Sequence, residues 1–232
     1  ALSHMRAAAE LLKNGEGYVF PLDIQGAFDT AHIVYGDALF YDLYDDPEFV
    51  HHLLRLSAAA VKYGLEECFK VMPFSGKTVT HYNTLAIPRE LGGVKLSEDT
   101  STLLSKEQIE EFVVPYMHDI LEYFGGGYIH YCGKNDYLFE AVMREPLAYG
   151  LNFGNNEKHD MDAVLARCAA ENKIYYGGVD MLPGEGRREY FTRVLKAART
   201  SDGRFNLLLG CHCESLHLDT LISDWEEAQE LV

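Results

Sequence analysis

The alternation of short apolar strands with longer helices most constrains how this chain can fold. About six strands are predicted, at residues 17–26, 92–96, 125–133, 149–153, 174–180 and 205–210, and residues 78–82 are also strand-like. Helices are predicted at 5–13, 47–69, 106–124, 136–144, 161–171 and 187–199, and others start near residues 29 and 219. Glycines and polar residues gather where the strands end. This pattern is typical of parallel βαβ units, so the sequence predicts an α/β protein.

Two ways of closing such a sheet remain open. One is a doubly wound open sheet and the other is a (β/α)8 barrel, and both bind ligands at the carboxyl ends of their strands. About six strands are fewer than a barrel needs, so a barrel here would lack its first one or two units. We expect residues 1–232 to form a single, partial domain.

Composition excludes several classes of partner. The chain has 20 basic and 36 acidic side chains, a net charge of −16, which repels nucleic acid and anionic lipid. Its apolar runs are shorter than the roughly 18 residues of a membrane-spanning helix. We therefore expect neither nucleic acid nor a membrane as a partner.

Cysteine usage indicates the compartment. Five cysteines are an odd number, and with no signal peptide at the start of the chain they favour a reducing cytoplasm over a disulfide framework. Cys68 and Cys168 fall inside helical patterns, where a small buried hydrophobic residue is the simplest interpretation.

A His-x-Cys pair ends the strand at residues 125–133. Residues two apart on a strand share a face, so the His130 imidazole and the Cys132 thiolate can reach one atom. A second apolar strand, at 205–210, ends in Cys211, His212 and Cys213. One nitrogen and one or two sulfurs suit zinc, and three protein ligands leave the fourth position open for chemistry.

Other polar residues follow strands and are weaker candidates. Glu98 and Asp99 could line the pocket, with a carboxylate completing the zinc shell or taking up a proton, or they could form a solvated turn. Gln25 and Asp180 could orient a substrate or satisfy local backbone groups. His81 and Asn83 follow the strand-like segment at 78–82 and are weaker still as substrate-binding residues.

Several segments together resemble the uroporphyrinogen decarboxylase superfamily, which also holds corrinoid-dependent methyltransferases. The segments that carry the resemblance are Gln25–Ala31, Asp45–Glu48, Gly93–Asp99, Ser105–Tyr116 and His130–Gly133. The resemblance covers nearly the whole chain and corresponds to the later two thirds of a typical member. It implies a TIM-type (β/α)8 barrel whose first one or two units are missing here.

The methyltransferase branch is the more similar one. Its members bind zinc through a His-x-Cys pair and a much later cysteine, which implies His130, Cys132 and Cys213 as ligands. The family has a single cysteine at the last position, so Cys211 or His212 could substitute for Cys213 here. Decarboxylases lack these ligands and use an arginine-rich amino-terminal segment to which nothing in this chain corresponds.

The resemblance implies a specific chemistry. Zinc would activate a small-molecule thiol, which would take a methyl group from a methyl-corrinoid presented by a corrinoid protein. Two other functions remain open: decarboxylation of a tetrapyrrole in the manner of uroporphyrinogen decarboxylase, and non-catalytic binding of a corrinoid or metal. An incomplete barrel leaves a strand edge that a second copy could cover, so a homo-oligomer is compatible with the sequence.

Overall fold

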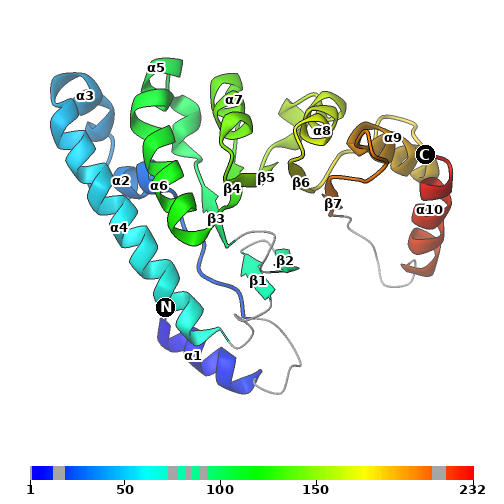
Figure 1. Cartoon of the computed structure of the whole chain (residues 1–232), viewed down its shortest axis with the longest axis horizontal. Coiled ribbons are helices and arrows are strands. Elements are labelled where there is room, and N and C mark those ends of the chain that lie inside the picture. Colours follow the sequence, from blue (N-terminus) through cyan, green and yellow to red (C-terminus); the bar gives the residue numbers. More distant parts are fainter. Residues whose placement is uncertain (1, 13–18, 73–77, 82–84, 89–92, 211–217) are drawn as a thin grey trace. The chain divides into compact units, whose positions relative to one another are not determined.

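A computed structural model of the chain describes residues 2–12, 19–72, 78–81, 85–88, 93–210 and 218–232. It divides into two compact units, Ala1–Tyr149 and Gly150–Val232. Both contain parallel strands separated by helices, as Figure 1 shows along the chain. The α/β fold that the sequence predicts is therefore present, and each unit is described by itself.

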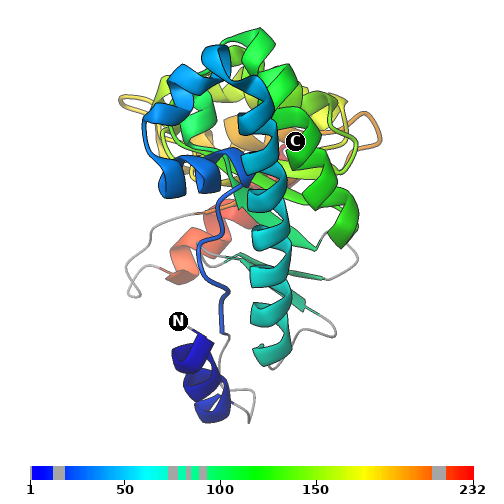
Figure 2. The ribbon, with the colours of Figure 1, turned by 90° about the vertical axis from the view of Figure 1, so that its left-hand side faces the viewer.

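The first unit begins with four helices. They are α1 (Leu2–Leu11), α2 (Ala27–Tyr35), α3 (Ala38–Asp45) and α4 (Pro47–Val71). Helix α4 starts as its sequence predicts: the Asp46 side chain accepts a hydrogen bond from the Phe49 N–H at 3.1 Å, and Pro47 occupies the first turn. Figure 2 shows α4 as one long rod with α1 near its carboxyl end. There Met5 of α1 joins Val19, Cys68 and Met72 in one buried cluster.

The helix predicted at 106–124 is interrupted. Ser105 caps α5 (Lys106–Gln108) through a capping box, and a π-helical turn at Ile109–Val113 then leads into α6 (Val114–Phe124). The sequence predicts a kink at Pro115. The structure places the irregular turn just before it, because proline has no N–H to continue the hydrogen-bond ladder.

Two parallel strands form the sheet of the first unit. Strand β3 (Val94–Ser97) pairs with β4 (Gly127–Tyr131), and Ser97 lies opposite His130. Within the described part of the strand predicted at 17–26, residues 19–26, the structure has one parallel bridge, between Gln25 and Ser97. The Gly26 N–H donates to the Ser97 carbonyl at 2.7 Å, and the Ser97 N–H donates to the Ile24 carbonyl at 3.2 Å.

The strand-like segment at 78–82 does not join this parallel sheet. It forms β1 (Thr78–His81), which pairs antiparallel with β2 (Leu85–Pro88) in a separate two-stranded sheet. The sequence indicated a strand here correctly, but β2 was not predicted. A two-stranded hairpin needs no intervening helix, so this segment is not a βαβ strand.

Helix α7 (Asp136–Arg144) follows β4 and leads to β5 (Ala148–Phe153), with which the second unit begins. Strand β5 pairs with β6 (Ile174–Gly177), and β6 pairs with β7 (Leu207–Leu209), all parallel. The helical segments of this unit are η4 (Asn156–Lys158), α8 (Met161–Ala170), α9 (Arg187–Ala198) and α10 (Leu218–Glu230).

Consecutive strands are neighbours within each unit, with no reversal of strand order of the kind that defines a doubly wound sheet. Five parallel strands, β3 to β7, with helices between them are the pattern of successive βα units in part of a TIM-type barrel. Among the residues that the structure describes, no helix has both the length and the apolar character needed to cross a bilayer.

Candidate metal centre

Three chain segments of the first unit end at the same edge of the sheet. Strands β3 and β4 are parallel, and Gln25 makes a parallel bridge with Ser97 at the end of β3. Carboxyl ends of neighbouring parallel strands meet at one edge, so the residues that follow each strand come together there. Glu98 and Asp99 follow β3, and Cys132 follows β4.

Asp99, His130 and Cys132 form a cluster of potential metal ligands. One ligand atom from each lies within 4.8 Å of the others. The Cys132 Sγ lies 3.6 Å from His130 Nε2, and that nitrogen lies 3.7 Å from Asp99 Oδ1. The Cys132 backbone N–H donates to the same Asp99 oxygen. A nitrogen, a sulfur and an oxygen therefore converge on one small volume.

The turn after Cys132 fixes this end of the cluster. Gly133 has φ of 92°, a conformation that favours glycine, and lets the chain leave the strand sharply. Asn135 caps α7 by accepting from the Tyr137 N–H at 2.9 Å. Its amide also donates to the carbonyls of Thr102 and Leu104, at 3.1 and 2.9 Å. Asn135 thus ties the loop after β4 to the loop after β3.

The electrostatics of the cluster favour a cation. Partial burial, and then the Asp99 carboxylate, raise the pKa of the Cys132 thiol, while Lys95 acts in the opposite direction. A thiolate beside a carboxylate is therefore unfavourable unless a positive charge lies between them. Nitrogen, sulfur and oxygen are also the ligand types that zinc takes in proteins, so the donor set fits that ion.

Lys95 brings a buried positive charge to the same face of the sheet. It lies on β3 two residues before Ser97, and only 2% of its side chain is exposed. Its ammonium lies 3.0 Å from Asp23 Oδ1 and 2.8 Å from Ser97 Oγ. Gln25, a predicted substrate-binding residue, donates from its side chain to the other Asp23 oxygen at 3.2 Å. The face of β3 beside the cluster is therefore polar, and its side chains are hydrogen-bonded.

Two buried carboxyl groups lie behind the cluster. Asp29 of α2 is 2% exposed and Glu98 is 1% exposed. Burial raises the pKa of Asp29 to about 6, although hydrogen bonds from the backbone at Asp99 and Thr100 oppose the shift. Burial, and then the charge of Asp29, raise the pKa of Glu98 well above its usual range. Like charges in a low-dielectric site disfavour joint ionisation, so each of these two carboxyl groups raises the pKa of the other.

The predicted site residues fall into three groups. His130, Cys132 and Asp99 come together in the cluster. Glu98 turns away from it: its carboxylate accepts from the Ser101 hydroxyl at 3.0 Å and lies against Gly26. Asn83, Cys211 and Cys213 lie outside the described residues, so the choice of third ligand stays a prediction. His81 ends the antiparallel strand β1, and its role also stays a prediction.

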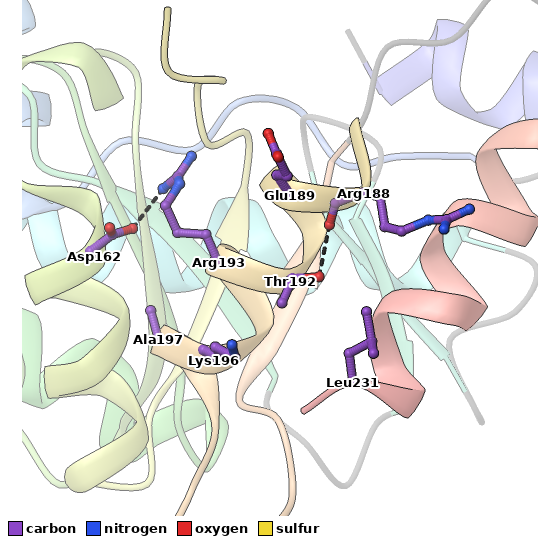
Figure 3. Close-up of a pocket in the computed structure, with 8 residues that line it drawn as sticks. All are labelled: Asp162, Arg188, Glu189, Thr192, Arg193, Lys196, Ala197 and Leu231. Carbon is purple, nitrogen blue, oxygen red and sulfur yellow. Dashed lines mark hydrogen bonds and ion pairs between the residues drawn. The ribbon is translucent and has the colours of Figure 1, made fainter. Parts of the chain in front are cut away.

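Asp180 belongs to the second unit, where it is exposed after β6. It lines a pocket of about 310 Å³ together with Asn156, Glu157, His159, Asp160, Met161, Asp162, Val179, Leu182 and Arg193. A neighbouring groove of about 770 Å³ is lined by residues of α8, α9 and the carboxyl terminus (Figure 3). Arg193 lines both, donating to Asp162 at 2.6 Å, to Glu185 at 2.7 Å and to the Asp180 carbonyl at 3.0 Å.

Sequence reasoning missed three residues that shape the centre. Lys95 lies between the apolar Val94 and Leu96, and a charged residue inside an otherwise apolar strand was the available signal. Asp23 and Asp29 precede and follow the bridge at Gln25, and no sequence motif links either to the strand 70 residues later that it contacts. Those two contacts are long-range and required the structure.

Comparison with known proteins supports the fold. No protein-family model matches the sequence, and no curated protein matches it. Among solved structures, a methyltransferase from Methanosarcina mazei is similar, with a TM-score of 0.62 and 11% sequence identity. The similarity covers 98% of this chain and 63% of that chain, so this chain spans less than two thirds of its neighbour's length. The chain therefore has a methyltransferase-like fold.

Proposed function

We propose that this protein is a zinc-dependent methyltransferase that moves a methyl group from a methyl-corrinoid to a small-molecule thiol. The observation that carries the proposal is the convergence of Asp99, His130 and Cys132 at the carboxyl edge of parallel strands. The fold supports it, because a solved structure with a similar fold is a methyltransferase. The enzyme class, the metal and the thiol acceptor all belong to the proposal.

The chain's own residues have distinct roles in this mechanism. His130 and Cys132 would hold the metal, and Cys213, or Cys211 in its place, would supply the third ligand. Zinc bound there would stabilise a coordinated substrate thiolate at neutral pH while leaving it nucleophilic. The Asp99 carboxylate lies beside these ligands and would add an oxygen to the ligand set. It would also accept the proton that the substrate thiol loses.

The charge around the centre suits an anionic reactant. Lys95 is the buried cation beside the cluster, and it favours a thiolate over a thiol as it does for Cys132. His130 is only 8% exposed, so water has little access to one side of the metal position. Cys132 is exposed and marks the open side, from which a thiol and a corrinoid carried by a partner protein would approach.

Metal analysis and a methyl-transfer assay test this function together. The purified chain should bind about one zinc per molecule and should convert methylcobalamin and a thiol to demethylated cobalamin and a thioether. The decrease in methyl-cobalt absorbance should require both zinc and thiol. His130→Ala and Cys132→Ala should abolish zinc binding and turnover, because each removes a ligand.

Matched variants control for nonspecific damage. His52→Ala removes an exposed histidine of α4, and Cys168→Ala removes a buried cysteine of α8, so both should leave zinc content unchanged. A zinc-loaded protein that leaves methylcobalamin untouched with every thiol would overturn the methyltransferase assignment. Release of carboxyl groups from uroporphyrinogen would then assign the decarboxylase function. Zinc or corrinoid binding without any turnover would assign a binding protein.

A further inference from the structure

Asp99 is held from two sides. Its side chain accepts from the Cys132 N–H and lies 3.7 Å from His130 Nε2. Its main chain is held separately: the carbonyl accepts from the Thr102 hydroxyl at 2.7 Å, and the N–H donates to the Asp29 carboxylate at 2.6 Å. The position of this candidate ligand therefore depends on a residue of another helix, 70 positions earlier in the chain.

The Asp29 carboxylate accepts hydrogen bonds from two consecutive backbone N–H groups. One carboxylate oxygen accepts from the Asp99 N–H, and the other accepts from the Thr100 N–H at 2.9 Å. These two N–H groups open the 3₁₀ turn η2 (Thr100–Leu103) and have no acceptor within that turn. Two bonds to one rigid carboxylate fix the orientation of the peptide as well as its distance, which a single bond does not.

Asp29 is itself placed firmly. It is 2% exposed in the first turn of α2, directly after the Gln25 bridge that joins this segment to the end of β3. The same strand end carries Glu98 and Asp99. Asp29 thus lies next to the metal centre without belonging to it. The hydrogen bonds described above join it to the backbone at Asp99 and Thr100, and not to any of the three clustered ligand atoms.

We infer that Asp29 is a positioning residue of the metal centre, which sets the affinity for the metal by fixing where the Asp99 carboxylate lies. This role rests on the proposed function. Outer groups that orient a metal ligand typically change metal affinity by about 10–100-fold when they are removed. If Asp29 were only a cap that stabilises the turn, removing it would lower the stability of the fold without acting on metal binding specifically through Asp99.

A double-mutant cycle on zinc affinity separates these two roles. Zinc dissociation constants would be measured by competition with a chromogenic chelator for the unsubstituted chain, Asp29→Ala, Asp99→Ala and the double variant. We expect Asp29→Ala to weaken zinc binding at least tenfold, and to have no further effect once Asp99→Ala has removed the carboxylate. Asp29→Asn keeps one acceptor oxygen, so it should weaken binding less than Asp29→Ala does.

Two additional measurements strengthen the test. Asp46→Ala removes a comparable cap at the start of α4, which bonds only local backbone, and should leave zinc affinity unchanged. Cobalt(II) in place of zinc should show a ligand-field spectrum that changes alike in Asp29→Ala and Asp99→Ala, because both displace the same oxygen. If Asp29→Ala does not fold, Asp29→Asn supplies the affinity and spectral data.

The outcomes are distinct. In one, Asp29→Ala weakens zinc binding by the same factor with and without the Asp99 carboxylate. That result would show that Asp29 acts on the fold in general and would overturn the inference. Unchanged zinc affinity in both Asp29 variants would overturn it as well. Failure of the unsubstituted chain to bind zinc would instead refute the proposed metal centre, and that result does not involve any variant.

Discussion

The two compact units use charge differently. In the first, Lys95, Asp29 and Glu98 are buried near the carboxyl edge of the sheet. Lys95 and Glu98 hydrogen-bond to serine hydroxyl groups, and Asp29 accepts from backbone N–H groups. In the second, the ion pairs of Arg188 and Arg204 involve partly or largely exposed side chains, whereas Arg193 and Glu185 form a pair whose side chains are 19% and 9% exposed. Charges removed from water interact more strongly and shift each other's pKa values, whereas exposed pairs are screened.

This difference bears on stability. A buried charge is costly unless it is paired and hydrogen-bonded, so losing one of its partners should cost more than losing a partner in an exposed ion pair. The ion pairs of the second unit join segments that are close together in the chain or in neighbouring helices. There Arg193 joins Asp162 on α8 to Glu185 and to the Asp180 carbonyl before α9. The following four predictions test the contrast, from the largest expected effect to the smallest.

Removing one partner of an ion pair should cost far more in the first unit. Asp23→Ala takes away the carboxylate partner of Lys95, whose side chain is 2% exposed, and we expect a loss of about 2–3 kcal/mol in unfolding free energy. Asp202→Ala breaks the exposed pair with Arg204 and should change stability much less, because solvent screens that pair. Urea denaturation measures both. Similar losses in the two variants would remove the contrast.

An added methyl group should also act unequally on the two units. A Cβ at Gly26 would lie 1.9 Å from Glu98 Oε1, so Gly26→Ala must displace a buried carboxyl group and should cost about 1–3 kcal/mol. Among the residues that the structure describes, the nearest atom to a Cβ at Gly178, which follows β6, is the Gly210 carbonyl oxygen at 4.0 Å. Gly178→Ala should therefore be nearly neutral in the same denaturation assay. Adding Glu98→Ala should relieve the Gly26→Ala clash, and full additivity of the two would argue against the contact.

The Arg193 network offers a smaller effect. Arg193→Lys keeps the charge but loses the planar fork that bonds Glu185 and Asp162 together, and we expect a loss of roughly 1 kcal/mol. Arg204→Lys alters a pair in which 70% of the arginine side chain is exposed and should change stability by less than about 0.5 kcal/mol. A larger loss at Arg204 than at Arg193 would show that exposure does not decide the strength of these pairs.

The pH dependence of stability should have opposite signs at Asp29 and Glu185. Burial raises the pKa of Asp29 to about 6, from 3.8 in the unfolded chain, so between about pH 4 and 6 the folded state holds a proton that the unfolded state has lost. This contribution therefore makes the protein less stable as pH rises through that window. Arg193 lowers the pKa of Glu185 from 4.5, so that contribution is present above about pH 4.5 and is lost as pH falls below it.

Unfolding free energies across pH 3–7, measured in the presence of a metal chelator, test both signs. Relative to Asp29→Asn, the unsubstituted protein should gain stability on acidification from pH 6 to 4. Relative to Glu185→Gln, it should lose its advantage as the pH falls below about 4.5. We expect the second effect to be the smallest of all, because the pKa of Glu185 is lowered less than the pKa of Asp29 is raised. Parallel pH profiles for the two comparisons would contradict the predicted opposition.

Local patterns were enough for much of the fold. Asp46 and Pro47 predicted the start of α4, Asn135 and Asp160 occupy the caps of α7 and α8, and the β3 to β7 segments were found from their apolar runs. The errors fall where a longer-range contact decides. Residues 17–26 have a strand pattern, yet among the described residues 19–26 the bridge to the sheet is at Gln25, and residues 78–81 pair with a neighbouring strand instead of joining the parallel sheet.

The candidate site was predicted in part. His130 and Cys132 are two residues apart on one strand, so strand periodicity alone placed them together. Glu98 and Asp99 were chosen as a pair, but adjacent residues point in different directions, and the structure assigns Asp99 to the cluster and Glu98 to a buried position against Gly26. Sequence spacing alone does not decide between two neighbouring carboxylates.

The sequence by itself therefore determined the α/β class, the parallel strands and the His-x-Cys pair, because capping, apolar periodicity and strand alternation act over a few residues. Tertiary structure decided which carboxylate joins that pair and that Lys95 lies buried beside Asp23. It also decided that the Asp29 carboxylate accepts a hydrogen bond from the Asp99 backbone N–H. These contacts join positions about 70 residues apart. Their energy depends on burial, which arises only when separate segments pack together.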